Sequence, residues 1–157
     1  MLTSIKTLYL RAIRLCTKID WIGPLVVRLL VGTAFVVTGW GKLHSLDQVT
    51  DFFASLHIPA PGAQAAFVST VEFVGGLMLI TGFGTRIASL LLIGVMTVAT
   101  LTAIAPKADS LIDLVSSIEL TYLALFVWLL VSGGGAASVD RLLVRRGQAD
   151  HQVGEAA

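Results

Sequence analysis

Four long apolar stretches constrain the fold of this chain more than any other feature. A bilayer core about 30 Å thick is crossed by about 20 mostly apolar residues in a helix, because unpaired backbone groups are costly in lipid. The stretches run from Trp21 to Trp40, from about Ala63 to Phe83, from Ile87 to Ala105 and from Leu111 to Val131. The fourth is long enough only if Asp113 and Glu119, near its start, are included. The pattern therefore predicts four membrane-spanning helices.

The composition excludes the main soluble classes of protein. Of 157 residues, 55% are hydrophobic and 13% are charged, well below the share of about 25% that a soluble domain carries. The net charge of +1 lacks the basic excess of a nucleic-acid-binding domain, so no nucleic-acid partner is expected. The single cysteine, Cys16, excludes an internal disulfide and any thiolate-only metal site. We therefore predict an all-α integral membrane four-helix bundle, with the lipid bilayer as its principal partner.

Three parts of the chain differ in pattern. Residues 1–20 place apolar side chains at helical spacing beside Lys6, Arg11, Arg14 and Lys18, which predicts an N-terminal amphipathic interfacial helix. Residues 21–146 form the predicted four-span membrane domain. Residues 147–157 lack a periodic apolar face, so we expect a disordered tail.

The loops indicate further local structure. Between the first two spans, Ser45 and Gln48 have the spacing of a capping box that opens a short interfacial helix, Leu46 to Leu56. The prolines of the segment from His57 to Gly62 then end this helix. The turn around Gly84 and Thr85 is so short that spans two and three are expected to be antiparallel neighbours.

Lysine and arginine are distributed unevenly between the two predicted sides of the membrane. With the N-terminus in the cytoplasm, that side holds eight of them and the far side holds only Lys42 and Lys107. Because cytoplasmic loops are enriched in these residues, we expect a bacterial inner-membrane protein with both termini in the cytoplasm.

The charges inside the predicted spans are the candidate functional residues. Charged groups at a bilayer centre are disfavoured by about 2.5–3.5 kcal/mol, so they usually face the bundle interior and find partners. Counted from the cytoplasmic ends at about 1.5 Å per residue, Arg28 lies roughly 10 Å deep, Glu72 roughly 15 Å and Glu119 roughly 20 Å. These depths predict an Arg28–Glu72 ion pair. Glu119 either extends this pair or approaches Lys42 at the outer rim. Trp40, beside Lys42, completes the candidate set.

The chemistry of this cluster leaves two interpretations open. One arginine and two ionised glutamates leave a negative charge uncompensated, so either Glu119 is solvated or one glutamate takes up a proton. A carboxyl of that kind beside a polar cavity suits a quinone headgroup site or a proton relay. The other interpretation is that the ion pair only fixes helix register.

His44 and His57 lie in the predicted outer loop without metal-ligand spacing, so no metal or haem is expected. No self-contained catalytic motif is present.

Several short motifs, in order and at matching spacing, resemble the DoxX family of small bacterial four-helix membrane proteins. The resemblance covers roughly Ile22 to Leu143. The motifs are Arg28 with Gly32 and Phe35; Gly39-Trp40-Gly41-Lys42-Leu43; Phe53 to Pro61; Glu72-Phe73-Val74-Gly75-Gly76; Gly82-Phe83-Gly84-Thr85-Arg86; Glu119-Leu120; and Gly135-Ala136-Ala137-Ser138-Val139-Asp140.

The resemblance implies a function at the level of the family. Relatives are similar to the membrane subunit of thiosulfate:quinone oxidoreductase, and others are linked to membrane redox and thiol-stress complexes. The resemblance implies that this chain is a subunit of a quinone-linked redox complex in sulfur or thiol metabolism. Quinone is then the candidate cofactor and a redox subunit the candidate partner. A non-catalytic structural or partner-binding subunit, a homo-oligomer, and a small-solute or proton pathway are the alternatives.

Overall fold

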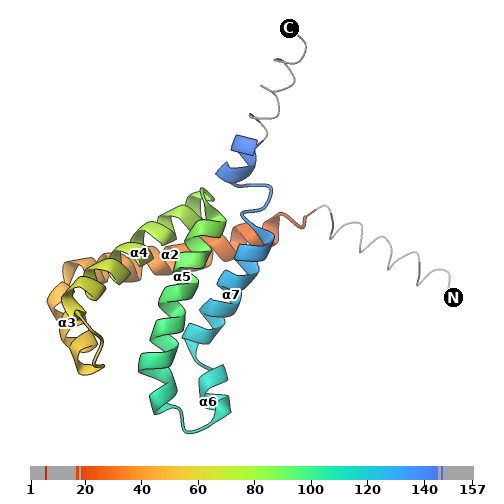
Figure 1. Ribbon diagram of the computed structural model, residues 1–157. Helices are drawn as coiled ribbons and strands as arrows, with labels where there is room; N and C mark the ends of the chain where they lie inside the picture. Colours follow the sequence, from red (N-terminus) through yellow and green to blue (C-terminus); the bar gives the residue numbers. More distant parts are fainter. Residues whose placement is uncertain (1–5, 7–16, 18, 145, 147–157) are drawn as a thin grey trace.

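The computed structural model describes residues 6, 17, 19–144 and 146, and the described chain is helical (Figure 1). The predicted helix over residues 1–20 and the predicted tail over 147–157 lie almost wholly outside these residues. The helices are α2 (Ile22–His44), α3 (Leu46–Ser55), α4 (Pro61–Thr81), α5 (Thr85–Ala99), α6 (Leu111–Val115) and α7 (Ile118–Ser132). A π-helical turn, Thr100–Ile104, and a 3₁₀ turn, Ala105–Lys107, extend α5.

Three helices match the predicted spans. Ile22–His44, Pro61–Thr81 and Thr85–Lys107 are each long and apolar enough to cross a membrane. The predicted continuous fourth span is wrong, because the chain breaks at Ser116 and Ser117 into α6 and α7. Ser117 has an extended backbone, and its side chain accepts a hydrogen bond from the Leu120 N–H, which starts a new helix. The 15 residues of α7 measure about 22 Å, less than the bilayer core.

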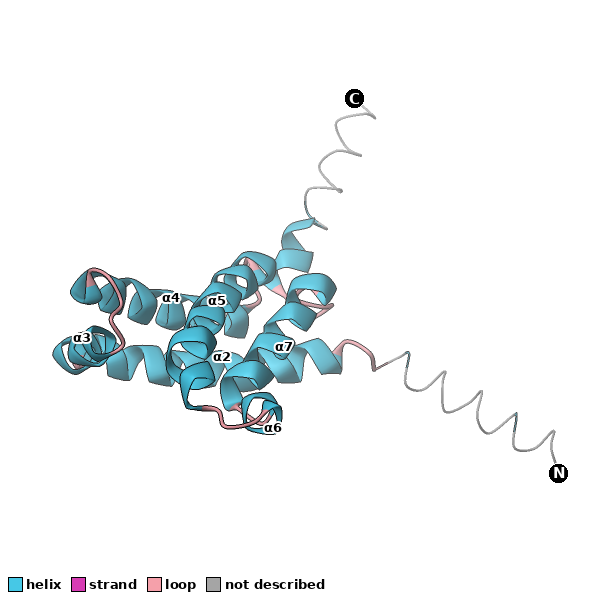
Figure 2. Ribbon diagram, turned by 60° about the horizontal axis from the view of Figure 1, so that its bottom comes forward, coloured by secondary structure: helices cyan, strands magenta, loops and turns pink. Residues whose placement is uncertain are grey.

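The helices form two antiparallel hairpins that meet at one end and diverge at the other (Figures 1 and 2). One hairpin is α2 and α4, connected by α3, and the other is α5 and α7, connected by α6. The Gly82–Gly84 turn joins α4 to α5 as expected, yet each of these helices packs mainly against another partner. The spans are therefore arranged as two splayed pairs.

Glycines set the contact between α2 and α4. A Cβ atom added to Gly32 would lie 2.9 Å from the Gly76 carbonyl oxygen, and one added to Gly76 would lie 2.7 Å from the Gly32 carbonyl oxygen. One added to Gly39 would lie 2.5 Å from the Phe73 nitrogen. The glycines therefore allow a close approach of the two helices, which fixes which of their residues lie opposite each other.

The short helix between these two spans also differs in one detail from its prediction. The helix is present as α3, but the capping box at its start is wrong, because the Ser45 hydroxyl donates instead to the Gly41 carbonyl, 2.8 Å away. His57 and Ala60, both with positive φ, turn the chain, and Pro61 begins α4.

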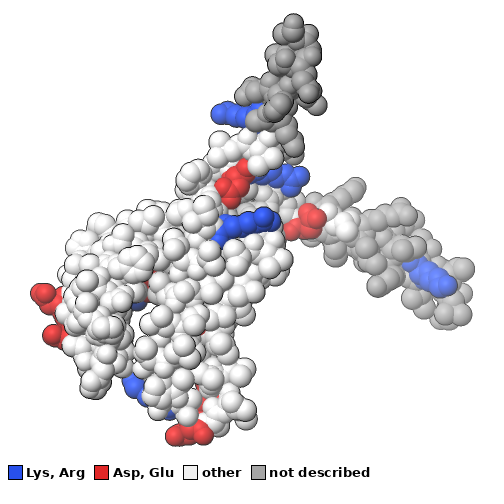
Figure 3. All heavy atoms as spheres, in the orientation of Figure 1, with Lys and Arg blue, Asp and Glu red and all other residues white. Residues whose placement is uncertain are grey.

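The packed core lies where the hairpins meet. Its buried side chains include Phe35, Leu79, Leu92, Phe126 and Leu129. Many other large apolar side chains remain exposed, among them Leu30, Ile87 and Leu101 at 63–69%. In Figure 3 the charged side chains gather where the hairpins meet and at their outer tips, and the surface between is almost uncharged. This is the surface of a helical bundle whose sides face lipid.

Candidate functional site

Arg28 lies at the end of the bundle where the two hairpins meet, opposite their connecting helices α3 and α6, and we call this the closed end. Its side chain binds backbone carbonyl groups. The side chain is 1% exposed. Its Nε donates to the Leu79 oxygen at 2.8 Å and its Nη2 to the Ile80 oxygen at 3.2 Å, both in the last turn of α4. Its Nη1 donates to the carbonyls of Gly134 and Ala137, which follow α7. The predicted Arg28–Glu72 ion pair is therefore wrong.

The register of α2 against α4 explains why this pair does not form. Since Gly32 lies against Gly76 and Gly39 against Phe73, the residues opposite Arg28 are those at the end of α4. Glu72 lies seven residues before Leu79, which is about 10 Å along the helix. The depths inferred from the sequence missed this offset because they placed the start of α2 and the end of α4 at one level, whereas the end of α4 lies beside Arg28.

Asp140 completes this closed end. Its carboxylate accepts hydrogen bonds from the backbone N–H groups of Gly84, at 2.6 Å, and Thr85, at 3.0 Å, and so caps the first turn of α5. Its own N–H donates to the Gly82 oxygen at 3.0 Å. Ser138 caps the short helical segment that follows it, since its Oγ accepts from the Arg141 N–H. We call Arg28, Asp140 and their backbone partners the closed-end cluster.

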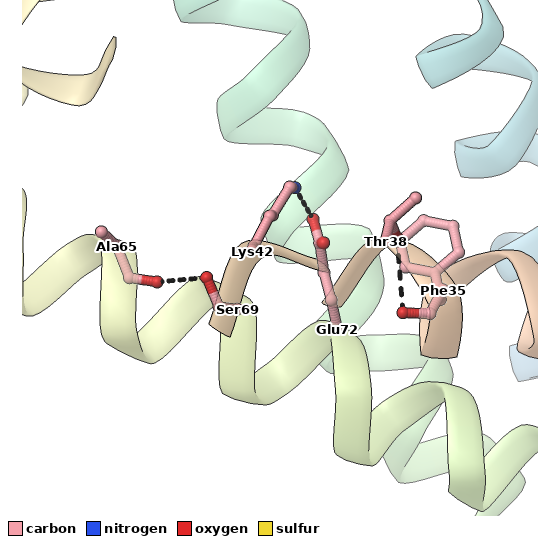
Figure 4. Close-up of polar contacts among 6 residues, drawn as sticks. All are labelled: Phe35, Thr38, Lys42, Ala65, Ser69 and Glu72. Atoms are coloured by element: carbon pink, nitrogen blue, oxygen red, sulfur yellow. Dashed lines mark hydrogen bonds and ion pairs between the residues drawn. The ribbon is translucent and has the colours of Figure 1, made fainter. Parts of the chain in front are cut away.

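Glu72 forms its ion pair with Lys42 instead (Figure 4). The Lys42 Nζ lies 2.6 Å from Glu72 Oε1. The Glu72 side chain is 2% exposed and that of Lys42 38%, so the pair joins a buried carboxylate to an accessible ammonium. Glu72 Oε2 has no hydrogen-bond partner in the described chain.

The neighbouring hydroxyl groups do not supply the missing donor. The Ser69 hydroxyl donates to the Ala65 carbonyl at 2.7 Å, one turn earlier on α4. The Thr38 hydroxyl donates to the Phe35 carbonyl at 3.3 Å (Figure 4). A buried acceptor without a donor is uncommon in folded proteins and costs about 1–3 kcal/mol. Glu72 Oε2 is therefore a buried acceptor whose hydrogen-bonding capacity the described residues do not meet.

Lys42 and Glu72 lie in the wall of a cavity of about 830 Å³ between the two hairpins. Figure 3 shows the cleft from one side. The lining is mostly apolar, and its polar side chains are Thr38, Lys42, Gln64, Glu72, Thr102, Lys107, Glu119 and Tyr122. Phe35 and Tyr122 contribute an aromatic wall, with ring centroids 5.1 Å apart in an edge-to-face arrangement.

The five candidate residues from the sequence separate into three places. Lys42, Glu72 and Glu119 line the cavity. Arg28 belongs to the closed-end cluster, outside the lining. Trp40 is 55% exposed, contacts the rings of His44 and Phe73, and is likewise not among the lining residues.

Sequence reasoning missed three polar or aromatic lining residues that helical spacing could have found. Tyr122 follows Glu119 by three residues, and Thr38 precedes Lys42 by four, so each shares a helix face with a residue already selected. Gln64 precedes Glu72 by eight residues on α4, again on one face. Lys107 carried no such signal, because it follows the π-helical turn that changes the helix phase.

Comparisons with known proteins agree with this architecture. The chain is 30% identical to Inner membrane protein YqjF of Escherichia coli (strain K12) over 129 residues, which cover 82% of this chain and 98% of that protein. It is 26% identical to Inner membrane protein YphA of the same strain, over 74% of this chain and 87% of that protein. It is 31% identical to "Putative oxidoreductase CatD" of Bacillus subtilis (strain 168), over 45% of this chain and 51% of that protein.

The match to a protein family agrees with these relatives. No solved structure matches the chain. The model of the DoxX family matches residues 23–105, which include Lys42 and Glu72. The match covers more than half of the sequence, and the YqjF alignment extends over most of the remainder. This chain therefore belongs to the DoxX family of membrane proteins.

Proposed function

We propose that this protein is the quinone-binding membrane subunit of a redox complex, and that the Lys42–Glu72 cavity is the binding site. The observation that carries the proposal is an ion pair between a buried carboxylate, with one unpartnered oxygen, and an accessible ammonium in the wall of a mostly apolar cavity. A lipid-soluble quinone combines an apolar tail with a small polar ring. Its ring would meet the ion pair and its tail the apolar lining.

The size and opening of the cavity support a ligand that arrives from the bilayer. Small-molecule sites are typically about 300–1,000 Å³, and this cavity is about 830 Å³. Three of its lining side chains, Phe52, Phe67 and Leu90, are also 47–59% exposed. The cavity is therefore bordered by accessible apolar side chains, which favours lateral entry of an apolar molecule.

The residues present can bind and orient the ring. Lys42 donates hydrogen bonds, the Glu72 carboxylate accepts them, and the Phe35–Tyr122 wall contacts the ring face or edge. We propose that a redox subunit exchanges electrons with the bound quinone. Support comes from the similarity to the protein named "Putative oxidoreductase CatD" and from the family resemblance.

A pair of glycine substitutions tests the site. Gly94 lines the cavity, and a Cβ added there meets no atom within 4 Å, so Gly94→Phe should fill the cavity without displacing backbone. Gly41 also has open space around its Cβ but is not a lining residue, so Gly41→Phe is the matched control. In nanodiscs, we expect Gly94→Phe to weaken binding of decylubiquinone at least tenfold and Gly41→Phe to leave it unchanged. Equal affinities in the two folded variants would refute the site.

The same pair tests the redox role. In membranes that contain the whole complex, Gly94→Phe should lower the rate of quinone reduction or quinol oxidation in proportion to its weaker binding. An unchanged rate would favour the structural or partner-binding alternative. A pathway across the membrane has less support, because the closed-end cluster joins the hairpins at one end of the bundle.

We also propose that the closed end faces the cytoplasm. Arg86 and Arg141 lie at this end, whereas Lys42 and Lys107 lie towards the diverging ends, which fits the excess of basic residues expected on the cytoplasmic side. In a Cys16→Ser background, Asp109→Cys should react with an impermeant maleimide in intact cells, and Arg141→Cys only after lysis. The reverse pattern would contradict this orientation.

A further inference from the structure

The geometry points to a site that is selective for the oxidation state of its ligand: it binds the hydroquinone, which carries hydroxyl groups, more tightly than the quinone. This inference rests on the proposed function and adds which form of the ring the cavity holds. It follows from the hydrogen-bonding capacity of the Lys42–Glu72 pair.

The Glu72 carboxylate has spare acceptor capacity and no donor of its own. An ionised carboxylate accepts at about four lone-pair positions and donates at none. Here one position is used, by Lys42 Nζ at 2.6 Å, and Oε2 has no partner. The nearby hydroxyls of Ser69 and Thr38 donate to carbonyl groups of their own helices. Among the described residues, Glu72 Oε2 therefore has no hydrogen-bond donor, and a ligand can bring one.

The Lys42 ammonium is the accessible half of the pair. It carries three N–H donors, one of which is directed to Glu72, and its side chain is 38% exposed beside the cavity. A ligand hydroxyl placed here can accept a hydrogen bond from Nζ and donate one to the carboxylate at the same time. Both hydrogen bonds involve a charged partner, and such bonds are shorter and stronger than neutral ones.

A quinone carbonyl satisfies only half of this arrangement. Its oxygen can accept from Nζ, but it has no proton for Glu72, and two acceptor oxygens brought together repel. Glu72 Oε2 would stay unpartnered, which is the unfavourable state for a buried polar atom. One charge-assisted hydrogen bond corresponds to roughly a tenfold or larger difference in affinity.

The net charge of the pair also limits the ligand. Because Lys42 and Glu72 neutralise each other, a neutral aromatic hydroxyl fits, whereas an anionic headgroup would bring a second negative charge next to Glu72. The aromatic wall of Phe35 and Tyr122 favours a flat ring over a flexible chain. A lipid-soluble hydroquinone meets both conditions, and a fatty acid meets neither.

The test compares one ligand in two oxidation states. The dissociation constants of decylubiquinol and decylubiquinone are measured anaerobically on the full chain in nanodiscs. We expect the reduced form to bind at least tenfold more tightly. In a redox titration the bound couple should then shift to a higher potential, by about 30 mV for each tenfold difference.

Two variants test whether the Glu72 carboxylate is the cause of the preference for the reduced form. Glu72→Gln has nearly the same shape but supplies an N–H₂ donor that can serve a carbonyl, so the preference for the reduced form should fall to threefold or less. Asp51→Asn makes the same carboxylate-to-amide change at an exposed position on α3 outside the lining, and it should keep the full preference.

The outcomes distinguish this inference from the proposed function. Equal binding of the two forms to the unmodified protein would overturn the selectivity and leave the quinone site standing. An unchanged preference in folded Glu72→Gln would also overturn it. If neither form binds, or if oleate binds as tightly as the reduced form, the proposed quinone site itself is refuted. The redox titration gives a second reading of the same ratio if Glu72→Gln fails to fold.

Discussion

Replacing Arg28 with methionine should destabilise the folded protein strongly, through the loss of backbone contacts and without the loss of an ion pair. Arg28→Met keeps most of the apolar length of the side chain and removes only the guanidinium. That group donates to four carbonyl oxygens, two at the end of α4 and two after α7. Its removal therefore loosens the contact that holds the two hairpins together.

The magnitude follows from the partners that are left behind. The Leu79 oxygen keeps a second donor, the Gly82 N–H at 3.2 Å, whereas the Ile80, Gly134 and Ala137 oxygens lose their arginine donor. The buried Gly134 carbonyl left unsatisfied would cost about 1–3 kcal/mol, and each of the two part-buried hydrogen bonds, to Ile80 and Ala137, about 0.5–1.5 kcal/mol. Removing the guanidinium also removes the cost of burying a charge, which offsets part of this loss, so we expect a net loss of about 2–4 kcal/mol.

The assay is equilibrium unfolding in mixed micelles, with double-mutant cycles. Arg28→Met and Glu72→Gln should be additive within about 0.5 kcal/mol, because the two side chains share no partner. Arg141→Met, the same change at an exposed position, should alter the free energy of unfolding by less than about 0.5 kcal/mol. A loss below about 1 kcal/mol for Arg28→Met, or a coupling above about 1 kcal/mol with Glu72, would refute this reasoning.

Three further substitutions test other parts of the fold. Asp140→Asn should lower the free energy of unfolding by about 1 kcal/mol and speed hydrogen exchange of the Gly84 amide, because the cap of α5 is weakened; unchanged exchange would contradict that role. Gly76→Ala should cost about 1–3 kcal/mol by forcing α2 away from α4, whereas Gly41→Ala, whose Cβ meets no atom within 4 Å, should cost nothing measurable; equal effects would disprove the close packing. Ser117→Ala should cost about 0.5–2 kcal/mol in the same unfolding assay, and no loss would show that the break before α7 has another cause.

The membrane-spanning helices could be predicted from the sequence because lipid imposes length and hydropathy on each segment independently. Three of the four spans follow from that rule alone. The fourth failed because hydropathy averages over Ser116 and Ser117, whereas the helix boundary depends on one side chain accepting a backbone hydrogen bond. Local polar chemistry of this kind is visible in the sequence only when the serines are read as caps.

The arrangement of the charges was harder to predict, because it depends on register between helices. Glu72 and Lys42 were both selected from the sequence, but Glu72 was assigned to Arg28. An offset of about 10 Å decides which pair forms, and the offset is set by contacts of Gly32 and Gly39 with α4. Aligning the glycines of the two helices first would have placed Arg28 opposite the end of α4. The splay of the hairpins, and with it the cavity, had no signal in hydropathy.

The structure separates the intramembrane charges by whether their hydrogen-bonding capacity is met, and this gives a last prediction. Lys42 and Glu72 interact with each other, so Lys42→Met together with Glu72→Leu removes both charges and should leave the protein folded, since apolar replacement of a buried pair is often neutral or stabilising. Decylubiquinol binding should nevertheless be lost, and retained binding would show that the pair does not contact the ligand. No equivalent replacement exists for Arg28, because its partners are backbone carbonyls that substitution cannot remove. A charge satisfied by backbone groups holds the fold, and a charge left with free capacity beside a cavity is available for a ligand.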